Sequence, residues 1–182
     1  MSDRIRRADS WARRADNGVR SRFVLCGGCF DPLHAGHLAY VAAAKACGTS
    51  MPLIAVATDA QIRAKGREPV LLQEERVALL RAVPFLGIVL AQDDTGVVTI
   101  IRRYRPDVYV LGEDYRACVP EADAAACRQC GVEIVFVDCR ATSSTAIMRR
   151  YEEARMDWCA SGSTSAFEAF GPIWYGKLYG KT

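Results

Sequence analysis

The chain has 182 residues, of which 51% are apolar, and this is enough for one ordinary domain with its own core. No run of roughly 18 or more apolar residues occurs, so the composition argues against a membrane-spanning helix. The N-terminal charges are not followed by the apolar stretch of a secretory signal. We therefore expect a cytoplasmic protein without a membrane partner.

The net charge of +3 is unevenly distributed along the chain. Residues 1–22 carry seven Arg and three Asp, a net of +4, so the remainder is close to neutral. A protein that binds nucleic acid through its main body usually carries more positive charge, and we expect no nucleic-acid partner. A solvated basic helix over 1–21 is the simpler interpretation of the N-terminal charge, and contact with RNA or an anionic surface is the alternative.

Short apolar runs alternate with helical patterns along the rest of the chain. In chain order we predict a strand at 23–26, a helix at 36–47, a strand at 53–57, a helix at 72–83, a strand at 87–91, a helix at 97–104, a strand at 108–111, a helix at 121–130, a strand at 132–137 and a helix at 143–156. This alternation is typical of a parallel sheet covered by helices on both faces. We predict an α/β protein with a Rossmann-like, five-stranded parallel sheet.

The pattern divides the chain into three parts: the basic helix (1–21), one domain (22–156) and an aromatic-rich tail (157–182). The tail is too aromatic for a typical disordered linker. We expect it to pack on the domain or on a second copy of the chain, so a homodimer is one possible assembly. After the Ser-Gly-Ser-Thr-Ser run at 161–165, its aromatic residues are Phe167, Phe170, Trp174, Tyr175 and Tyr179.

The sharpest motif is Gly-Gly-Cys-Phe-Asp-Pro-Leu-His-Ala-Gly-His over 27–37, between the first strand and the first helix. Glycines let a backbone approach phosphates closely, and a helix N-terminus offers free N–H donors. His34 and His37 are the only histidines in the protein. On a first helical turn both can face one ligand and stabilise the charge that builds at phosphorus during a displacement.

Metal binding is the alternative for this motif. The His34 and His37 pair lacks an obvious third ligand on the same turn, although Asp31 or Cys29 could serve. The eight Cys include two Cys-x-x-Cys spacings, at 26–29 and 127–130, but they are too far apart for a finger or ribbon. We therefore expect buried thiols and no metal ligands in the protein.

The run Gly-Cys-Phe-Asp-Pro-Leu-His-Ala-Gly-His over 28–37 resembles the signature of the cytidylyltransferase-like nucleotidyltransferases, which have the HIGH-type fold. The resemblance extends over roughly 19–151. Within the family, the chain is most similar to the adenylyltransferase domain of bacterial ADP-heptose synthases and next to glycerol-3-phosphate cytidylyltransferases. The further blocks that carry it are Thr58-Asp59, Lys65–Pro69, Glu75-Arg76, Asp93-Asp94-Thr95, Arg105–Tyr115 and Ser143-Ser144-Thr145.

One block departs from the heptose type, which usually reads Val-Lys-Gly-Gly-Asp-Tyr. This chain reads Val-Leu-Gly-Glu-Asp-Tyr over 110–115, with Leu111 in place of Lys and Glu113 in place of Gly. Losing a cation and gaining an anion near a nucleotide should alter how a phosphate or a base is held.

The resemblance implies transfer of a nucleoside monophosphate from an NTP to a phosphorylated substrate, with release of pyrophosphate. This reaction needs positioning and charge stabilisation rather than a protein nucleophile, with Mg²⁺ bound mainly through the phosphates. ATP with a sugar 1-phosphate, such as D-glycero-β-D-manno-heptose 1-phosphate, is the favoured pair. CTP with glycerol 3-phosphate or a similar polyol phosphate is the alternative, and a non-catalytic nucleotide- or RNA-binding paralogue is a second one.

The same resemblance assigns the site residues. We expect catalytic roles for His34, His37 and Lys65. We expect nucleotide binding by Gly28, Cys29, Phe30, Gly36, His37, Gly112, Asp114, Ser143, Ser144 and Thr145. We expect substrate binding by Asp31, Asp59 and Arg76. Structural roles stay open for four residues: a solvated Lys65, a loop-orienting Asp31, a capping Asp59 and an exposed helical Arg76 paired with Glu.

Overall fold

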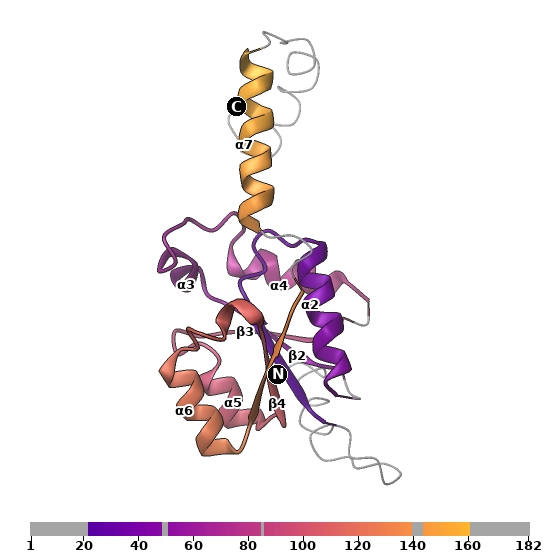
Figure 1. The fold of residues 1–182 in the computed structure, drawn as a ribbon, viewed down its shortest axis with the longest axis vertical. Helices are drawn as coiled ribbons and strands as arrows, with labels where there is room; N and C mark the ends of the chain where they lie inside the picture. Colours follow the sequence, from indigo (N-terminus) through magenta and orange to yellow (C-terminus); the bar gives the residue numbers. More distant parts are fainter. Residues whose placement is uncertain (1–21, 49–50, 85, 140–143, 161–182) are drawn as a thin grey trace. The chain divides into compact units, whose positions relative to one another are not determined.

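A computed structural model describes residues 22–48, 51–84, 86–139 and 144–160, and Figure 1 shows their arrangement along the chain. The side chains of 145 and 154–160 are not described. The predicted helix over 1–21, Ser143 and most of the aromatic tail lie outside the described residues. Contacts divide the chain into two units, 1–144 and 145–182, and each is treated by itself.

The first unit is built on one five-stranded sheet in which all neighbouring strands are parallel. The order of strands across the sheet is β3-β2-β1-β4-β5. Every predicted strand is present, with small differences at its ends. The strands are β1 (Val24–Gly28), β2 (Leu53–Val56), β3 (Ile88–Ala91), β4 (Val108–Gly112) and β5 (Glu133–Val137).

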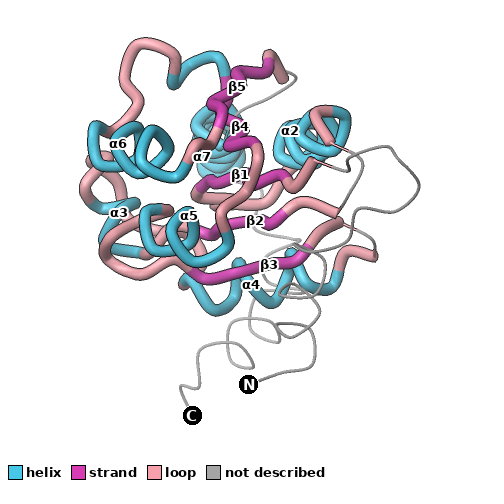
Figure 2. Tube along the Cα trace, turned by 90° about the horizontal axis from the view of Figure 1, so that it is seen from below, coloured by secondary structure: helices cyan, strands magenta, loops and turns pink. Residues whose placement is uncertain are grey.

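Helices cover both faces of this sheet. Figure 2 shows α5 and α6 on one face, and α2 and α4 on the other. The predicted Rossmann-like α/β fold is therefore confirmed. The helices of the first unit are α2 (Ala35–Ala46), α3 (Asp59–Arg63), α4 (Gln73–Ala82), α5 (Val98–Tyr104) and α6 (Glu121–Cys130), with a short 3₁₀ helix η1 (Glu113–Tyr115) after β4.

Successive side chains of a strand point to opposite faces of the sheet, so one sheet carries a core on each face. Val24 and Cys26 of β1 pack with residues of α2 and α4, whereas Leu25 packs with residues of α5 and α6. All three side chains have no exposed surface. Because each face is covered, the strands are apolar throughout, which is the pattern that the sequence shows.

The last helix, α7 (Ser144–Ala160), belongs to the second unit except for its first residue, Ser144, which ends the first unit. The helix continues four residues past the end predicted at 156. Among the described residues, no helix combines the length and apolar character that a membrane span requires.

The strand order reverses between β1 and β4, which makes this gap the topological switch point where ligands bind in such sheets. The pairing of β1 with β4 ends at Cys26 and Val110. Just beyond it, the Tyr40 hydroxyl of α2 accepts a hydrogen bond from the Gly27 N–H (3.3 Å) and donates one to the Val110 carbonyl (2.6 Å). Tyr40 thus bridges the two strands where their own ladder stops.

Candidate functional site at the carboxyl edge of the sheet

The turn between β1 and α2 is tightly folded. Phe30 has a left-handed backbone (φ 53°) and only 1% of its side chain surface is exposed. A side chain at position 28 would lie 3.3 Å from the Phe30 ring, so Gly28 lets this ring fold back over the end of β1. A left-handed non-glycine residue costs about 1 kcal/mol or more, and such strain tends to persist at functional sites.

His34 and His37 lie together at the start of α2. His34 is the residue that precedes the helix, and its carbonyl accepts a hydrogen bond from the His37 N–H (2.9 Å). Their rings stack with centroids 3.8 Å apart and planes 24° apart, and the His37 ring packs 5.0 Å from that of Phe30. The structure therefore brings the two predicted imidazoles onto one spot beside the switch point.

The electrostatics of this pair favour neutral rings. Burial lowers the pKa of His34, while burial and then the neighbouring His34 lower the pKa of His37 to about 4. The Nδ1 atoms of both rings are buried and have no hydrogen-bond partner among the described residues. A buried polar atom without a partner costs about 1–3 kcal/mol, so the pair lowers stability, which is more typical of a functional site than of a scaffold.

Lys65 reaches the same edge from the segment after α3. Its Nζ donates hydrogen bonds to the Tyr115 hydroxyl (2.6 Å) and to the Cys29 sulfur (3.4 Å), and it lies 5.3 Å from the centroid of the Tyr115 ring. Desolvation lowers the pKa of Lys65, but the hydrogen bond to Tyr115 and the contact with Cys29 outweigh it and raise the pKa above its usual value. Lys65 is exposed, yet its ammonium group is held, charged, between the loops that follow β1 and β4.

Asp31 has the loop-orienting role. Its side chain is fully buried, and its carboxylate pairs with Arg67 (2.5 Å) and accepts hydrogen bonds from the Val70 and Leu71 N–H groups (both 2.9 Å). Burial alone would raise the pKa of Asp31, but Arg67 and the two backbone donors hold it below its usual value. The carboxylate is turned into the loop 67–71 and is not open to a substrate.

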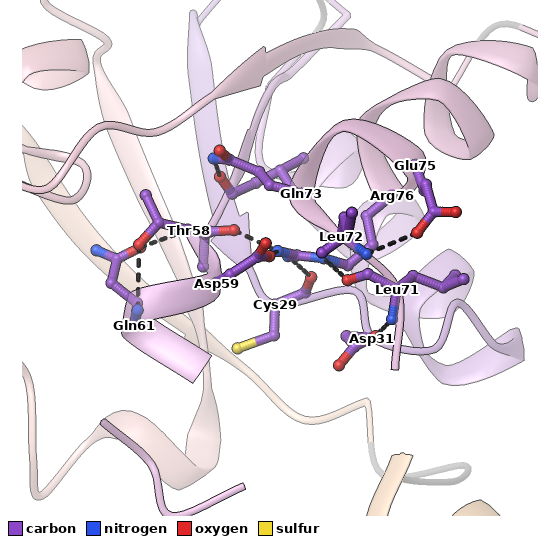
Figure 3. A network of polar contacts seen from close by, with 12 residues as sticks. Cys29, Asp31, Thr58, Asp59, Gln61, Leu71, Leu72, Gln73, Glu75 and Arg76 are labelled. Carbon is purple, nitrogen blue, oxygen red and sulfur yellow. Dashed lines mark hydrogen bonds and ion pairs between the residues drawn. The ribbon is translucent and has the colours of Figure 1, made fainter. Parts of the chain in front are cut away.

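Arg76 of α4 is the centre of the network drawn in Figure 3. Its guanidinium donates to the carbonyls of Leu71 (3.0 Å), Cys29 (2.6 Å) and Ala57 (2.8 Å) and pairs with Asp59 (2.5 Å). Only 1% of Arg76 is exposed, so the interpretation as an exposed helical residue is wrong. It ties together the segments after β1 and β2 and the start of α4, which leaves no open face for a substrate phosphate.

Asp59 is the first residue of α3, and Thr58 is the residue that caps this helix. The Thr58 hydroxyl accepts a hydrogen bond from the Gln61 backbone N–H (3.1 Å), and the side-chain Oε1 of Gln61 accepts one from the Thr58 N–H (2.8 Å), which forms a capping box. The capping interpretation of Asp59 is therefore wrong. Its carboxylate pairs with Arg76 and keeps 22% of the side chain surface exposed.

The end of β4 and the segment after it show where both departures from the heptose-type block lie. Leu111 is 3% exposed and belongs to the core between the sheet and α5 and α6, so its side chain does not face the open edge. Glu113 pairs with Arg116, whose guanidinium lies 4.4 Å from the Phe136 ring centroid. The extra carboxylate is thus neutralised locally rather than standing alone beside the site.

The remaining predicted residues divide between the two units. Gly36 is buried in the first turn of α2, and a side chain at Gly112 would collide with the carboxylate of Asp114, which is itself exposed. The Ser144 hydroxyl lies 3.5 Å from the Pro32 carbonyl and donates to it. Thr145 belongs to α7 of the second unit, and Ser143 lies outside the described residues.

Three residues of this edge were not singled out from the sequence. Tyr40 and Arg67 hold backbone segments, and Tyr115 holds Lys65. Tyr115 ends the Gly-x-Asp-Tyr block, and Arg67 lies two residues after Lys65. Both residues therefore lie within motifs that the sequence analysis identified, although it assigned them no role. Within the described ranges, no group of three or more His, Cys, Asp or Glu side chains is placed to hold a metal ion.

Fold and site together define a Rossmann-like α/β protein with a histidine pair beside a tight, glycine-containing turn at the switch point. Residues 25–150 match the cytidylyltransferase-like family, and the chain belongs to that family, as its motifs predicted.

Named relatives agree with this assignment, and a solved structure agrees with the fold. The bifunctional protein HldE of Streptomyces coelicolor is 36% identical over 146 residues, 77% of this chain and 30% of that protein. HldE of Campylobacter curvus is 32% identical over 155 residues, 83% of this chain and 32% of that protein. This chain therefore spans about a third of the length of these relatives. A lipopolysaccharide core biosynthesis protein from Thermoplasma volcanium has the same fold, with a TM-score of 0.55, 24% identity and coverage of 65% of this chain and 96% of that one.

Proposed function

We propose that this protein is a nucleotidyltransferase that transfers AMP from ATP to a sugar 1-phosphate, such as D-glycero-β-D-manno-heptose 1-phosphate, and releases pyrophosphate. The observation that carries the proposal is the stacked pair of His34 and His37 at the start of α2, with two buried Nδ1 atoms that lack a partner in the described structure. Membership of the cytidylyltransferase-like family supports the same class of reaction.

The geometry indicates how the chain would act. A phosphate oxygen of the sugar phosphate attacks the α-phosphorus of ATP, the bond from that phosphorus to the bridging oxygen breaks, and pyrophosphate leaves in line. Neutral imidazoles at His34 and His37 each offer one N–H donor to the phosphate oxygens. Lys65 brings a fixed positive charge to the same edge, so the charge that develops meets preorganised partners.

Magnesium fits this site through the nucleotide rather than through a cage of side chains. Asp31 and Asp59 are engaged by Arg67 and Arg76, and no carboxylate cluster exists among the described residues. Mg²⁺ bound to the triphosphate would neutralise phosphate charge and help pyrophosphate to leave. The protein's own contribution would be to hold the phosphates against His34, His37 and Lys65.

Two features support ATP and a sugar phosphate over CTP and glycerol 3-phosphate. The relatives named above are HldE proteins, and residues 112–115 keep the Gly-x-Asp-Tyr pattern of the heptose type although Leu111 and Glu113 depart from its usual sequence. The cytidylyltransferase reaction is the second candidate, because the family as a whole carries that name. The expected homodimer depends on the tail after residue 160, which lies outside the described residues.

The test is pyrophosphate release with Mg²⁺ over a grid of four NTPs and a set of phosphates: heptose 1-phosphate, hexose 1-phosphates and glycerol 3-phosphate. We expect turnover with ATP and heptose 1-phosphate. Turnover with CTP and glycerol 3-phosphate would replace this assignment by the second candidate. ATP binding without turnover of any pair would favour another acceptor, and absence of NTP binding would leave the non-catalytic paralogue.

A further inference from the structure

Asp123 is a polar residue that the proposed reaction does not use. It lies in the first turn of α6 and is half-buried against the face of the sheet that carries Tyr109. Its backbone N–H bonds to the Pro120 carbonyl (3.0 Å), but no hydrogen bond or ion pair reaches its carboxylate from the described part of the chain. A half-buried carboxylate without such a partner is unusual, because burial of a charge is costly unless it is compensated.

Other polar atoms converge on the same place from different segments. Gly96 has a left-handed backbone (φ 68°) in the buried turn before α5. A side-chain carbon placed on it would lie 3.1 Å from Nε2 of Gln61, 3.8 Å from Oε1 of Gln92 and 3.9 Å from Oδ1 of Asp123. Gly96 therefore lies among three polar atoms that come from α3, from the end of β3 and from α6.

These atoms keep hydrogen-bonding capacity that none of the described residues uses. The side-chain oxygen of Gln61 accepts a hydrogen bond in the capping box, so its Nε2 remains available as a donor. The Nε2 of Gln92 donates to the Ala55 carbonyl (3.1 Å), so its Oε1 remains available as an acceptor. The Tyr109 hydroxyl lies 3.5 Å from the side-chain position of Gly27 and has no hydrogen bond to the described residues. Donors and acceptors are thus both available around one carboxylate.

We infer that Asp123, Gln61, Gln92 and Tyr109 form a subsite for the hydroxyl groups of a neutral sugar ring. Each sugar hydroxyl both donates and accepts, which suits a mixture of amide, hydroxyl and carboxylate groups, whereas the carboxylate would repel a phosphate. The subsite lies near the end of β1 on the face of the sheet that α5 and α6 cover, and the histidines lie at the start of α2. This inference rests on the proposed function and names the part of the chain that selects the sugar.

The protonation of Asp123 agrees with this role. Burial raises the pKa of its carboxyl group to about 6. A desolvated carboxylate without a partner lowers the stability of the folded chain near neutral pH. An uncharged residue at this position would make the fold more stable, so the carboxylate is better explained by a role in binding.

The test compares Asp123→Asn with Glu121→Gln, an exposed acid in the same helical turn. In turnover assays, Asp123→Asn should raise the KM for the sugar phosphate about ten-fold or more, because a buried polar group of the site loses its fit to a substrate hydroxyl. The KM for ATP should change less than about two-fold, and Glu121→Gln should match the wild type in both. Tyr109→Phe, which removes one hydroxyl, should raise the sugar phosphate KM by about three- to ten-fold.

A second readout separates this inference from the proposed function. Saturation-transfer NMR with free D-mannose, a neutral sugar, should show binding to the wild type and to Glu121→Gln and little or none to Asp123→Asn. Equal mannose signals in the wild type and Asp123→Asn, or an ATP KM that rises together with the sugar phosphate KM, would overturn the subsite. Loss of all turnover with mannose binding retained would overturn the proposed reaction and leave the subsite standing.

Discussion

Two polar regions lie at the same edge of the sheet and differ in one respect. Around Arg76, the guanidinium bonds to three carbonyls and one carboxylate, so the region is complete without a ligand. Around His34, His37 and Asp123, buried or half-buried polar groups lack partners among the described residues. A native structure satisfies nearly all of its buried polar groups, so the exceptions indicate a place kept for function rather than for stability.

The difference separates scaffold from site. Arg76 and Asp31 fix the loops that follow β1 and β2, and those loops carry Cys29 and Lys65 to the switch point. The first region should therefore stabilise the chain, and the second should lower its stability while serving binding. Each prediction below measures one side of this comparison.

The largest effect on stability is expected from Arg76→Met. This substitution leaves three carbonyls without a donor and Asp59 without its partner, which should lower the free energy of unfolding by about 3–5 kcal/mol. Urea denaturation measures the loss. Arg81→Met is the matched control, since Arg81 is an exposed residue of the same helix with one hydrogen bond, to Val89, and should cost less than about 1 kcal/mol. Equal losses in the two variants would mean that the network does not hold the loops.

His34→Asn should have the opposite profile. Asn is favoured at the residue that precedes a helix, so α2 should keep its start and the midpoint of thermal unfolding should not fall. The value of kcat/KM for the transferase reaction should fall about 10²–10³-fold, the usual cost of removing a preorganised donor. Steady-state kinetics and thermal unfolding measured on the same sample test this pair of outcomes. Activity within about three-fold of the wild type would remove His34 from the reaction.

The two unpartnered groups should give pH dependences of opposite sign. The pKa of His37 is about 4 in the fold against an ordinary 6.5, so the unfolded chain binds more protons between these values. Stability should therefore fall as the pH drops from about 6.5 to 4, by at most about 3 kcal/mol. The pKa of Asp123 is about 6 against an ordinary 3.8, so its contribution should fall as the pH rises from about 4 to 6.

Single variants separate these slopes. Asp123→Asn should stabilise the chain at pH 7–8 by about 1–2 kcal/mol after allowance for its partial exposure, and should steepen the acid loss. His37→Asn should flatten that loss. Urea midpoints at pH 4, 5, 6 and 7 report both effects, and identical pH profiles for the wild type and the two variants would contradict the account of the unpartnered groups.

The smallest predicted effect concerns the ammonium group of Lys65. Tyr115→Phe keeps the ring beside Lys65 but removes the hydroxyl bond, and should raise the KM for ATP about three- to ten-fold with a smaller change in kcat. Lys65→Ala should lose more, while Arg63→Ala, which removes an exposed cation two residues away, should leave the kinetics unchanged. An ATP KM for Tyr115→Phe equal to that of the wild type would show that the hydroxyl does not position Lys65.

Periodicity predicted the sheet and the main helices because their apolar residues repeat along the chain. It did not predict α3, a five-residue helix that is too short for a periodic signal, although the Thr58-x-x-Gln61 spacing of its capping box is visible in the sequence. The extension of α7 past 156 was missed as well.

The motif at 27–37 predicted which residues meet at the switch point, but not which of their neighbours are buried. Arg76 follows two Glu residues and reads as part of a solvated helix face. Its burial depends on carbonyls from two distant loops that converge only in the folded chain. In the sequence, Leu111 replaces a Lys of the heptose type and suggested that a positive charge is lost beside the nucleotide. The fold instead places the Leu111 side chain in the core. Asp123 carries no motif at all, and only its surroundings draw attention to it.

The measurement that tests the central claim most directly is long-range ¹H–¹⁵N NMR of the imidazole nitrogens during titration with ATP and Mg²⁺. The protein has two histidines, so His34→Asn and His37→Asn assign every signal. We predict that the nitrogen resonances of both rings shift on binding and that the pKa of His37 rises from about 4, because negatively charged phosphates beside the rings favour the imidazolium form. Binding of ATP that leaves both sets of resonances and both pKa values unchanged would place the triphosphate elsewhere and contradict the account.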